Sequence, residues 1–146
     1  MPTSHLSPLT SKRIIARLAA PAPIAEAHPI AARFVYALRL IAVHERAGRD
    51  PVPELAARLG SVIVAAKALT LAQAITTCWP DDIHLSRFCC GWLSHDEATI
   101  AQLVEAAAAR DRARGDRALE GFVRRRRIER LWIAASELVI AELSAA

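Results

Sequence analysis

The sequence predicts an all-α fold: a single-domain, irregular bundle of five or six helices. Apolar residues recur every three or four positions over long stretches, and no stretch alternates apolar and polar residues as a half-buried strand does. Alanine, the strongest helix former, supplies much of the 53% hydrophobic content. The 146 residues fit one domain, and a domain of this length buries about 70% of the surface that the unfolded chain exposes.

The first 28 residues differ in composition from the rest of the chain. Four prolines (Pro2, Pro8, Pro21 and Pro23) surround a short amphipathic stretch, residues 11–20. Proline fixes its own backbone and removes a hydrogen-bond donor, so a dense set of prolines interrupts regular structure. We therefore expect residues 1–28 to form a proline-rich mobile arm with a short helix, followed by a helical domain over residues 29–146.

A long amphipathic helix is predicted over residues 29–47. It begins with a proline, which favours the first helical position, and it ends before Gly48. Arg33, Arg39 and Arg46 lie off its apolar stripe. The stripe has the three- and four-residue spacing of one helix face and consists of Ile30, Phe34, Ala37, Leu38 and Ile41.

Two further helices are predicted before the first long loop. Asp50 and Pro51 are typical of a helix start, and the helix that they open reaches Leu59. Ser61 caps the next helix, residues 62–78. The pair resembles a helix-turn-helix unit, in which the second helix reads bases with polar side chains. Because the second helix here is mostly apolar, we interpret both as core helices.

The second half of the chain begins with a long connection, residues 79–93. Ser94 and Glu97 then match a capping box, in which each side chain binds the backbone N–H of the other residue. Gly115 is predicted to break or kink the helical stretch that follows residue 110, so that a new helix begins at Asp116. The helices predicted here cover residues 94–110, 116–126 and 128–143.

The strongest charge feature is an arginine-rich segment, residues 110–130. It holds nine arginines and four acids, a surplus of five positive charges in a chain whose net charge is +4. Guanidinium groups bind phosphates, and a basic patch adds salt-sensitive affinity for nucleic acid. The interspersed acids favour a solvated helix face over such binding, and an acidic protein partner is a third interpretation. The candidate residues for binding a polyanion or a partner are Arg110, Arg112, Arg114, Arg117, Arg124, Arg125, Arg126, Arg127 and Arg130.

Three cysteines and two histidines lie in or beside the long connection, and they are weak candidates for a metal site. They are Cys78, His84, Cys89, Cys90 and His95. Thiolates and imidazoles are the usual zinc ligands. The segment has no CxxC pair, however, and two adjacent cysteines do not readily bind one tetrahedral ion. We therefore expect no metal and no cofactor, with the cysteines packed as small hydrophobic side chains.

The chain is not expected to be an enzyme. Its five glycines are scattered singly, and it contains neither the dinucleotide-binding nor the P-loop glycine motif. No family signature surrounds any cysteine and histidine that could form a nucleophilic pair.

A cytoplasmic location is expected. The N-terminal stretch lacks a convincing signal peptide, and an odd number of cysteines does not indicate a disulfide framework. The most apolar window, residues 61–78, carries Lys67 near its middle. Insertion of such a charge into a bilayer costs about 2.5–3.5 kcal/mol. We therefore interpret this window as a buried helix of a domain with no membrane partner.

The segments RFVYALRLIAVH and CCGWLSHDEATIAQLVEA combine an arginine inside an apolar helix with a paired cysteine before a capped helix. With these features, residues 29–142 resemble an uncharacterised bacterial family of small all-helical proteins. The resemblance implies a helical fold, and it implies no activity and no functional residues.

These observations lead to one expectation and two alternatives. We expect a non-enzymatic cytoplasmic interaction or regulatory protein that binds a macromolecular partner, or that self-associates as a homodimer through alanine- and leucine-rich helix faces. The first alternative is a nucleic-acid-binding protein that uses residues 110–130. The second is a metal-binding or thiol-based sensor that uses residues 78–95.

Overall fold

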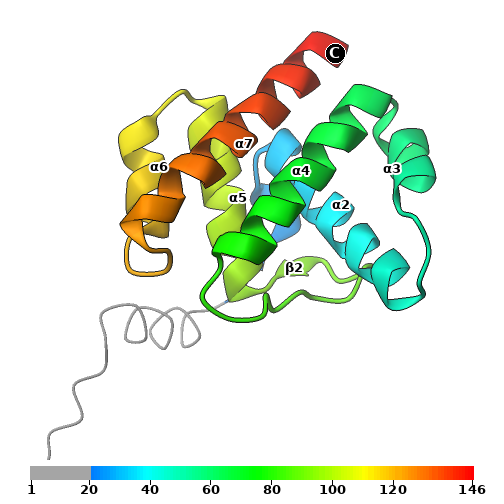
Figure 1. The fold of residues 1–146 in the computed structure, drawn as a ribbon, viewed down its shortest axis with the longest axis horizontal. Helices are drawn as coiled ribbons and strands as arrows, with labels where there is room; N and C mark the ends of the chain where they lie inside the picture. The colour runs from blue at the N-terminus through cyan, green and yellow to red at the C-terminus, as the bar shows by residue number, and fades with distance from the viewer. Residues whose placement is uncertain (1–20) are drawn as a thin grey trace, which may run out of the picture.

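The computed structural model describes residues 21–146, which form six α-helices and one short antiparallel sheet (Figure 1). The helices are α2 (Pro29–Arg46), α3 (Val52–Leu59), α4 (Val62–Cys78), α5 (His95–Ala108), α6 (Arg112–Leu119) and α7 (Arg125–Ala145). Strand β1 (Ala22–Pro23) leads into a 3-10 turn, η1 (Ile24–Glu26), and pairs with β2 (Trp92–Leu93). The predicted all-α, single-domain bundle is confirmed.

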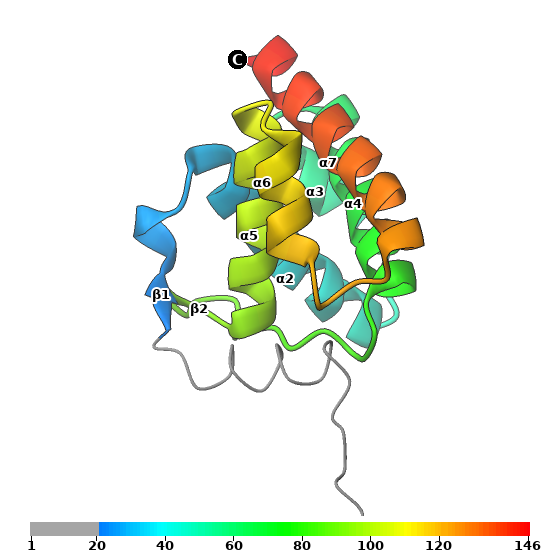
Figure 2. The same cartoon turned by 90° about the vertical axis from the view of Figure 1, so that its left-hand side faces the viewer.

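One core lies between the four longest helices. Leu71 and Ile75 of α4, Ile100 and Leu103 of α5, and Leu131 of α7 are all completely buried. Burial of a side chain of this size stabilises a fold by about 1.5–3 kcal/mol. In Figures 1 and 2, α4 and α7 lie side by side and run in opposite directions, in front of α2 and α5, while α3 and α6 flank them.

Local sequence signals set the starts of two helices. Ser61 Oγ accepts a hydrogen bond from the Val64 backbone N–H at 3.2 Å. Ser94 and Glu97 form the predicted capping box, with donor–acceptor distances of 3.1 and 2.8 Å. Gly60 turns the chain between α3 and α4 with a φ of +74°, which favours glycine. The helix starts predicted at Ser61 and Ser94 are therefore confirmed.

The helix predicted over residues 116–126 is wrong. Helix α6 instead runs through Gly115, and α7 begins at Arg125. The ring of Trp132 lies directly against Gly115, because a Cβ built on this glycine comes within 2.6 Å of Trp132 Cζ3. The glycine thus permits the close approach of α6 and α7 and does not break the helix.

Residues 21–28, the part of the predicted arm that the structure describes, pack against the helices. Their strand β1 pairs with β2, and Ile24 is buried in the core. The predicted short helix at residues 11–20 lies outside the described residues.

Helix α4 is the most apolar segment of the domain. Its inner face buries Val64, Ala68 and Leu71 against neighbouring helices. From residue 21 onward, no helix combines the length and the hydropathy that crossing a lipid bilayer requires.

Candidate functional site

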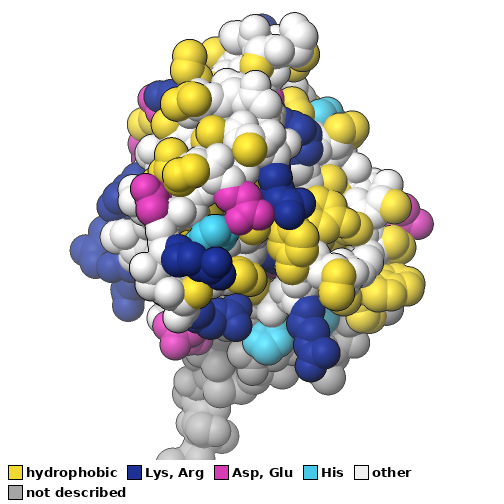
Figure 3. All heavy atoms as spheres, turned by 90° about the vertical axis from the view of Figure 1, so that its right-hand side faces the viewer, with side chains coloured by type: hydrophobic (Ala, Val, Ile, Leu, Met, Phe, Trp, Pro, Cys, Tyr) yellow, Lys and Arg dark blue, Asp and Glu magenta, His cyan; other side chains and the backbone are white. Residues whose placement is uncertain are grey.

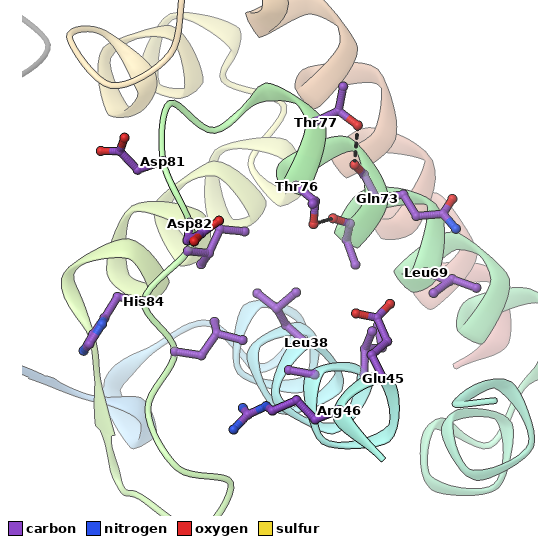
Figure 4. A pocket seen from close by; sticks show the side chains of 15 residues that line it. Leu38, Glu45, Arg46, Leu69, Gln73, Thr76, Thr77, Asp81, Asp82 and His84 are labelled. Carbon is purple, nitrogen blue, oxygen red and sulfur yellow. Dashed lines mark hydrogen bonds between the residues drawn. The ribbon is translucent and has the colours of Figure 1, made fainter. Parts of the chain in front are cut away.

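A groove with a volume of about 950 Å³ lies between α2, α4 and residues 81–85 of the loop that follows α4 (Figure 4). We call it the α2–α4 groove. Each helix contributes one face, because the lining residues recur at intervals of three and four positions. Seven apolar side chains line the groove: Leu38, Ile41, Ala42, Leu69, Ala72, Ile83 and Leu85.

Acidic side chains border this apolar floor. Glu45 lies on α2, and Asp81 and Asp82 lie on the loop, whereas Arg46 is the one arginine among the described lining residues. In Figure 4, Glu45 extends toward α4 and His84 points away from the hollow. The carboxylates of Glu45 and Asp82 thus give the groove a negative border, although the chain as a whole has a net charge of +4, whereas Asp81 extends to the outer side of the loop (Figure 4).

The threonines of the groove are occupied by their own helix. Thr76 Oγ1 donates to the Ala72 carbonyl at 3.0 Å, and Thr77 Oγ1 donates to the Gln73 carbonyl at 2.9 Å (Figure 4). The groove therefore offers mainly hydrogen-bond acceptors, since ionised carboxylates accept hydrogen bonds and do not donate them.

The end of the loop that forms one wall of the groove is held by a buried ion pair, which we call the Arg39–Glu97 clamp. Arg39 Nε and Nη2 donate to the two carboxylate oxygens of Glu97 at 2.7 and 2.9 Å. The guanidinium also donates to the carbonyls of Cys90 at 2.7 Å and of Trp92 at 2.9 Å. The side chains are 1% and 0% exposed, so one buried group connects α2, α5 and the end of the loop.

The clamp keeps both partners charged. Burial raises the pKa of the Glu97 carboxyl, but the hydrogen bonds from Arg39 and from the Ser94 backbone N–H outweigh burial, so the pKa of Glu97 lies below its usual value. The hydrogen bond to Glu97 raises the pKa of Arg39. A bidentate, fully hydrogen-bonded pair of this kind meets the conditions under which a buried charge is tolerated.

The start of α5 holds the middle of the same loop. The Asp96 carboxylate accepts a hydrogen bond from the His84 backbone N–H at 2.8 Å, and Ser94 Oγ donates to the His84 carbonyl. Asp96 is 4% exposed. The loop therefore has anchors at residue 84 and at residues 90–92, and these anchors fix the position of the neighbouring groove wall.

Arginines 112 and 114 of the predicted binding segment pair with acids of the same domain. Arg112 binds Asp116 at 2.9 Å and Glu129 at 2.6 Å, and Arg114 binds Glu105 at 3.1 Å. These contacts agree with a solvated helix face that carries internal ion pairs.

The remaining arginines of the segment differ in their contacts. Arg127 donates to the Thr77 carbonyl at 3.2 Å, and Arg117 also has an interaction partner. Of the nine arginines in residues 110–130, all of which the structure describes, five have a side chain without a hydrogen bond or ion pair: Arg110, Arg124, Arg125, Arg126 and Arg130. Four of these lie at the start of α7, whose first turn has no acid and no side-chain cap. On the face shown in Figure 3, Lys and Arg side chains gather along the left edge.

The structure does not bring the predicted cysteines and histidines together. Cys78 is buried at the end of α4, Cys90 is partly buried, and Cys89 is exposed. His84 is exposed and His95 is half-buried. Among the described residues, no three His, Cys, Asp or Glu side chains are placed to hold a metal ion.

Comparison with known protein families, with curated proteins and with solved structures finds no match for the chain. The predicted membership of a bacterial family of small helical proteins therefore stays a prediction. The function has to be inferred from the geometry of the domain.

The clamp and the groove are the features that the sequence patterns miss. Arg39 lies off the apolar stripe of its helix, yet it is 2% exposed. An arginine with apolar residues on both sides, as Arg39 has in the stretch ALRLIAV, is a local signal for a buried cation, whereas its partner Glu97 is visible only as a capping residue. The groove has no comparable signal, because its lining comes from three separate segments.

Proposed function

We propose that the protein is a non-enzymatic interaction protein of the cytoplasm, which holds a basic, amphipathic helix of a partner protein in the α2–α4 groove. The observation that carries this proposal is the combination of an apolar floor with the carboxylates of Glu45 and Asp82 at its border. Free thiols at Cys78, Cys89 and Cys90 agree with a reducing compartment.

The shape and charge of the groove support a helical partner. Helix-binding grooves take up apolar side chains at helical spacing, and complementary charges at the border orient the partner. Here the half-buried Leu69 and Leu85 offer apolar surface, while Glu45 and Asp82 border the floor from opposite sides. The hydrogen bonds of Asp96 and Ser94 to the backbone of residue 84 hold the loop wall before the partner binds, which lowers the cost of ordering this segment on binding.

A synthetic helix tests the proposal. The probe is a fluorescent peptide of about four helical turns, with leucines at helical spacing and lysines elsewhere, titrated with the full chain and followed by anisotropy. The expected result is saturable binding that weakens about tenfold, or about 1.4 kcal/mol, in the double variant Glu45→Lys and Asp82→Lys, because like charges then face each other.

The matched control is Glu26→Lys, which reverses an exposed charge outside the groove. It should bind the peptide as the wild type does. A second peptide with glutamates in place of the lysines should not bind. Absence of saturation with the lysine peptide, or equal weakening by Glu26→Lys, would refute the groove as the binding site.

A second candidate function, binding of a nucleic acid or another polyanion, is favoured by the start of α7. Arg124, Arg125 and Arg126 are exposed and unpaired within the described residues, and the amino end of a helix adds a partial positive charge. Arg130 lies about one turn further on. This arrangement suits the phosphate backbone of a nucleic acid.

A salt titration tests the polyanion candidate. Binding of a fluorescent DNA duplex should fall steeply with salt, and replacing Arg124, Arg125 and Arg126 by alanine should reduce the slope of log K against log salt by about 0.9 for each lost phosphate contact. The control variant, Arg46→Ala with Arg49→Ala, removes exposed arginines elsewhere. No binding at about 50 mM salt, or equal effects of both variants, would exclude this candidate.

A further inference from the structure

Helices α4 and α7 expose apolar side chains on their outer sides. Of the eight large hydrophobic side chains that are exposed in residues 21–146, five lie on these two helices. They are Val62, Ile63, Ile133, Ile140 and Leu143, which are 69, 67, 49, 64 and 58% exposed. We call this surface the α4–α7 face. Apolar side chains are exposed at the top of Figure 3, which is the height at which Figure 1 shows the C-terminal end of α7.

Two shallow hollows of similar size lie along this face. One, of about 510 Å³, is lined by Ile63 and Ile140, and the other, of about 470 Å³, is lined by Ile133. Glu137 belongs to both hollows and forms an ion pair with Lys67, with Nζ and Oε2 3.2 Å apart. The face therefore consists of two hollows on either side of a central charge pair, and the hollow beside Ile133 is also lined by Arg126, Glu129 and Arg130.

Helix α7 carries two apolar stripes. The inner stripe, which includes Leu131 and Leu138, is buried in the core. The outer stripe places Ile133 and Ile140 seven residues apart, with Leu143 three residues further on. Spacings of seven and three are those of a helix seam that packs against another helix. No described segment of the domain covers the outer stripe.

We propose that the α4–α7 face binds the same face of a second copy of this chain, with the two α7 helices antiparallel about a two-fold axis near Ser136 and Glu137. In this arrangement, Ile140 of each copy faces Ile133 of the other, because both lie about one helical turn from the axis. The hollow of about 510 Å³ in one copy then covers the hollow of about 470 Å³ in the other.

The charges on the face favour this antiparallel pairing. An axis beside Glu137 brings two Lys67–Glu137 pairs together, so that each lysine lies near two carboxylates. A parallel alignment would place Arg126 and Arg130 of both copies against each other, and like charges at an interface are unfavourable. A two-fold axis also makes the interface self-complementary and closed, as in most homodimers.

Molar mass in solution tests the pairing. Light scattering after size exclusion should give twice the chain mass of 15.9 kDa for the wild type at about 100 µM. Ile140→Glu or Ile133→Glu should raise the dimer dissociation constant at least about tenfold. The control is Val43→Glu, because Val43 lies on α2 outside the proposed interface and is 41% exposed. This variant should leave the dimer dissociation constant unchanged. Circular dichroism melting checks that each variant is folded.

Disulfide trapping tests the direction of pairing. In a background with Cys89→Ser and Cys90→Ser, a mixture of Ile133→Cys and Ile140→Cys chains should cross-link faster than either variant alone. Faster cross-linking of the single variants would show a parallel alignment and overturn the arrangement. A wild-type mass of one chain at about 100 µM, or equal weakening by Val43→Glu, would overturn the proposal itself. The α2–α4 groove lies on a neighbouring face of α4 and shares only Gln73 with the α4–α7 face, so either outcome leaves the proposed function untouched.

Discussion

Replacing Arg39 by methionine should cost a large part of the stability of this domain. The substitution keeps an unbranched side chain of similar length in α2 but removes the guanidinium that binds the buried Glu97 carboxylate. It also removes the donor of the Cys90 and Trp92 carbonyls. The variant therefore leaves the Glu97 carboxylate without its cationic partner, with the Ser94 backbone N–H still donating to it, and leaves two carbonyls without the guanidinium donor.

The size of the effect follows from the burial of the pair. Removing one partner of a buried ion pair costs about 3–5 kcal/mol, out of the roughly 5–15 kcal/mol that holds a typical domain folded. The side chains of Arg39 and Glu97 are 1% and 0% exposed, so solvent screens little of this loss. For a domain of this size each kcal/mol lowers the melting temperature by about 2–4 °C, which predicts a decrease of about 6–20 °C.

Urea unfolding, followed by circular dichroism, measures the loss directly. The control is Arg58→Met, since Arg58 forms an exposed pair with Glu54, and exposed pairs contribute about 0–1 kcal/mol. The double variant Arg39→Met with Glu97→Met should be more stable than Arg39→Met alone, because it leaves no unpaired charge in the core.

The pH dependence gives a second readout. The pKa of Glu97 in the folded state lies below its usual value, so the ionised clamp contributes its full stabilisation to the wild type above about pH 4.3. The wild type loses this stabilisation as the pH falls through the lower pKa of the folded state. Without Arg39, burial favours the neutral acid and raises the pKa of Glu97. The difference in unfolding free energy between wild type and Arg39→Met should therefore narrow from pH 7 toward pH 5.

Two results would refute the clamp as a structural determinant. One is a loss of unfolding free energy in Arg39→Met no larger than that in Arg58→Met. The other is a loss in the double variant equal to the sum of the losses in its two single variants.

Two further predictions follow from packing and exposure. Gly115→Ala should lower the free energy of unfolding in urea by about 1–3 kcal/mol, because the added Cβ lies 2.6 Å from the Trp132 ring. The control Gly91→Ala, whose Cβ has no atom within 4 Å, should change the free energy of unfolding by less than about 0.5 kcal/mol. Similar effects of the two substitutions would contradict the observed packing of α6 on α7. In a thiol-reagent assay, exposed Cys89 should react in the native state, and buried Cys78 should react only on unfolding, so that rapid native reaction of Cys78 would contradict its position.

Features that depend on neighbouring residues could be predicted from the sequence. The capping box at Ser94 and Glu97 lies within one helical turn, so its residue types alone indicate a helix start. The same is true of Ser61 and of the turn at Gly60. The apolar residues of α2 likewise predict a helix, because they recur every three or four positions and so mark one buried helix face.

Features that depend on distant residues could not be predicted. Gly115 reads locally as a helix break, and only the ring of Trp132, on another helix, gives the reason for glycine in α6. Arg39 reads as a surface residue because its partner Glu97 lies 58 positions away. The α2–α4 groove is a product of the same long-range packing, since two helices and a loop have to meet before its acids share one border.

Mapping the bound peptide by NMR tests the proposed groove most directly. The lysine and leucine peptide is titrated into the ¹⁵N-labelled protein, and the amide chemical shifts are followed. We predict that the shifts concentrate in residues 38–46, 69–77 and 81–85, and that they saturate. Shifts concentrated on the outer side of α7 around Ile133 and Ile140, or no saturable shifts in any of these segments, would contradict the groove as the binding site.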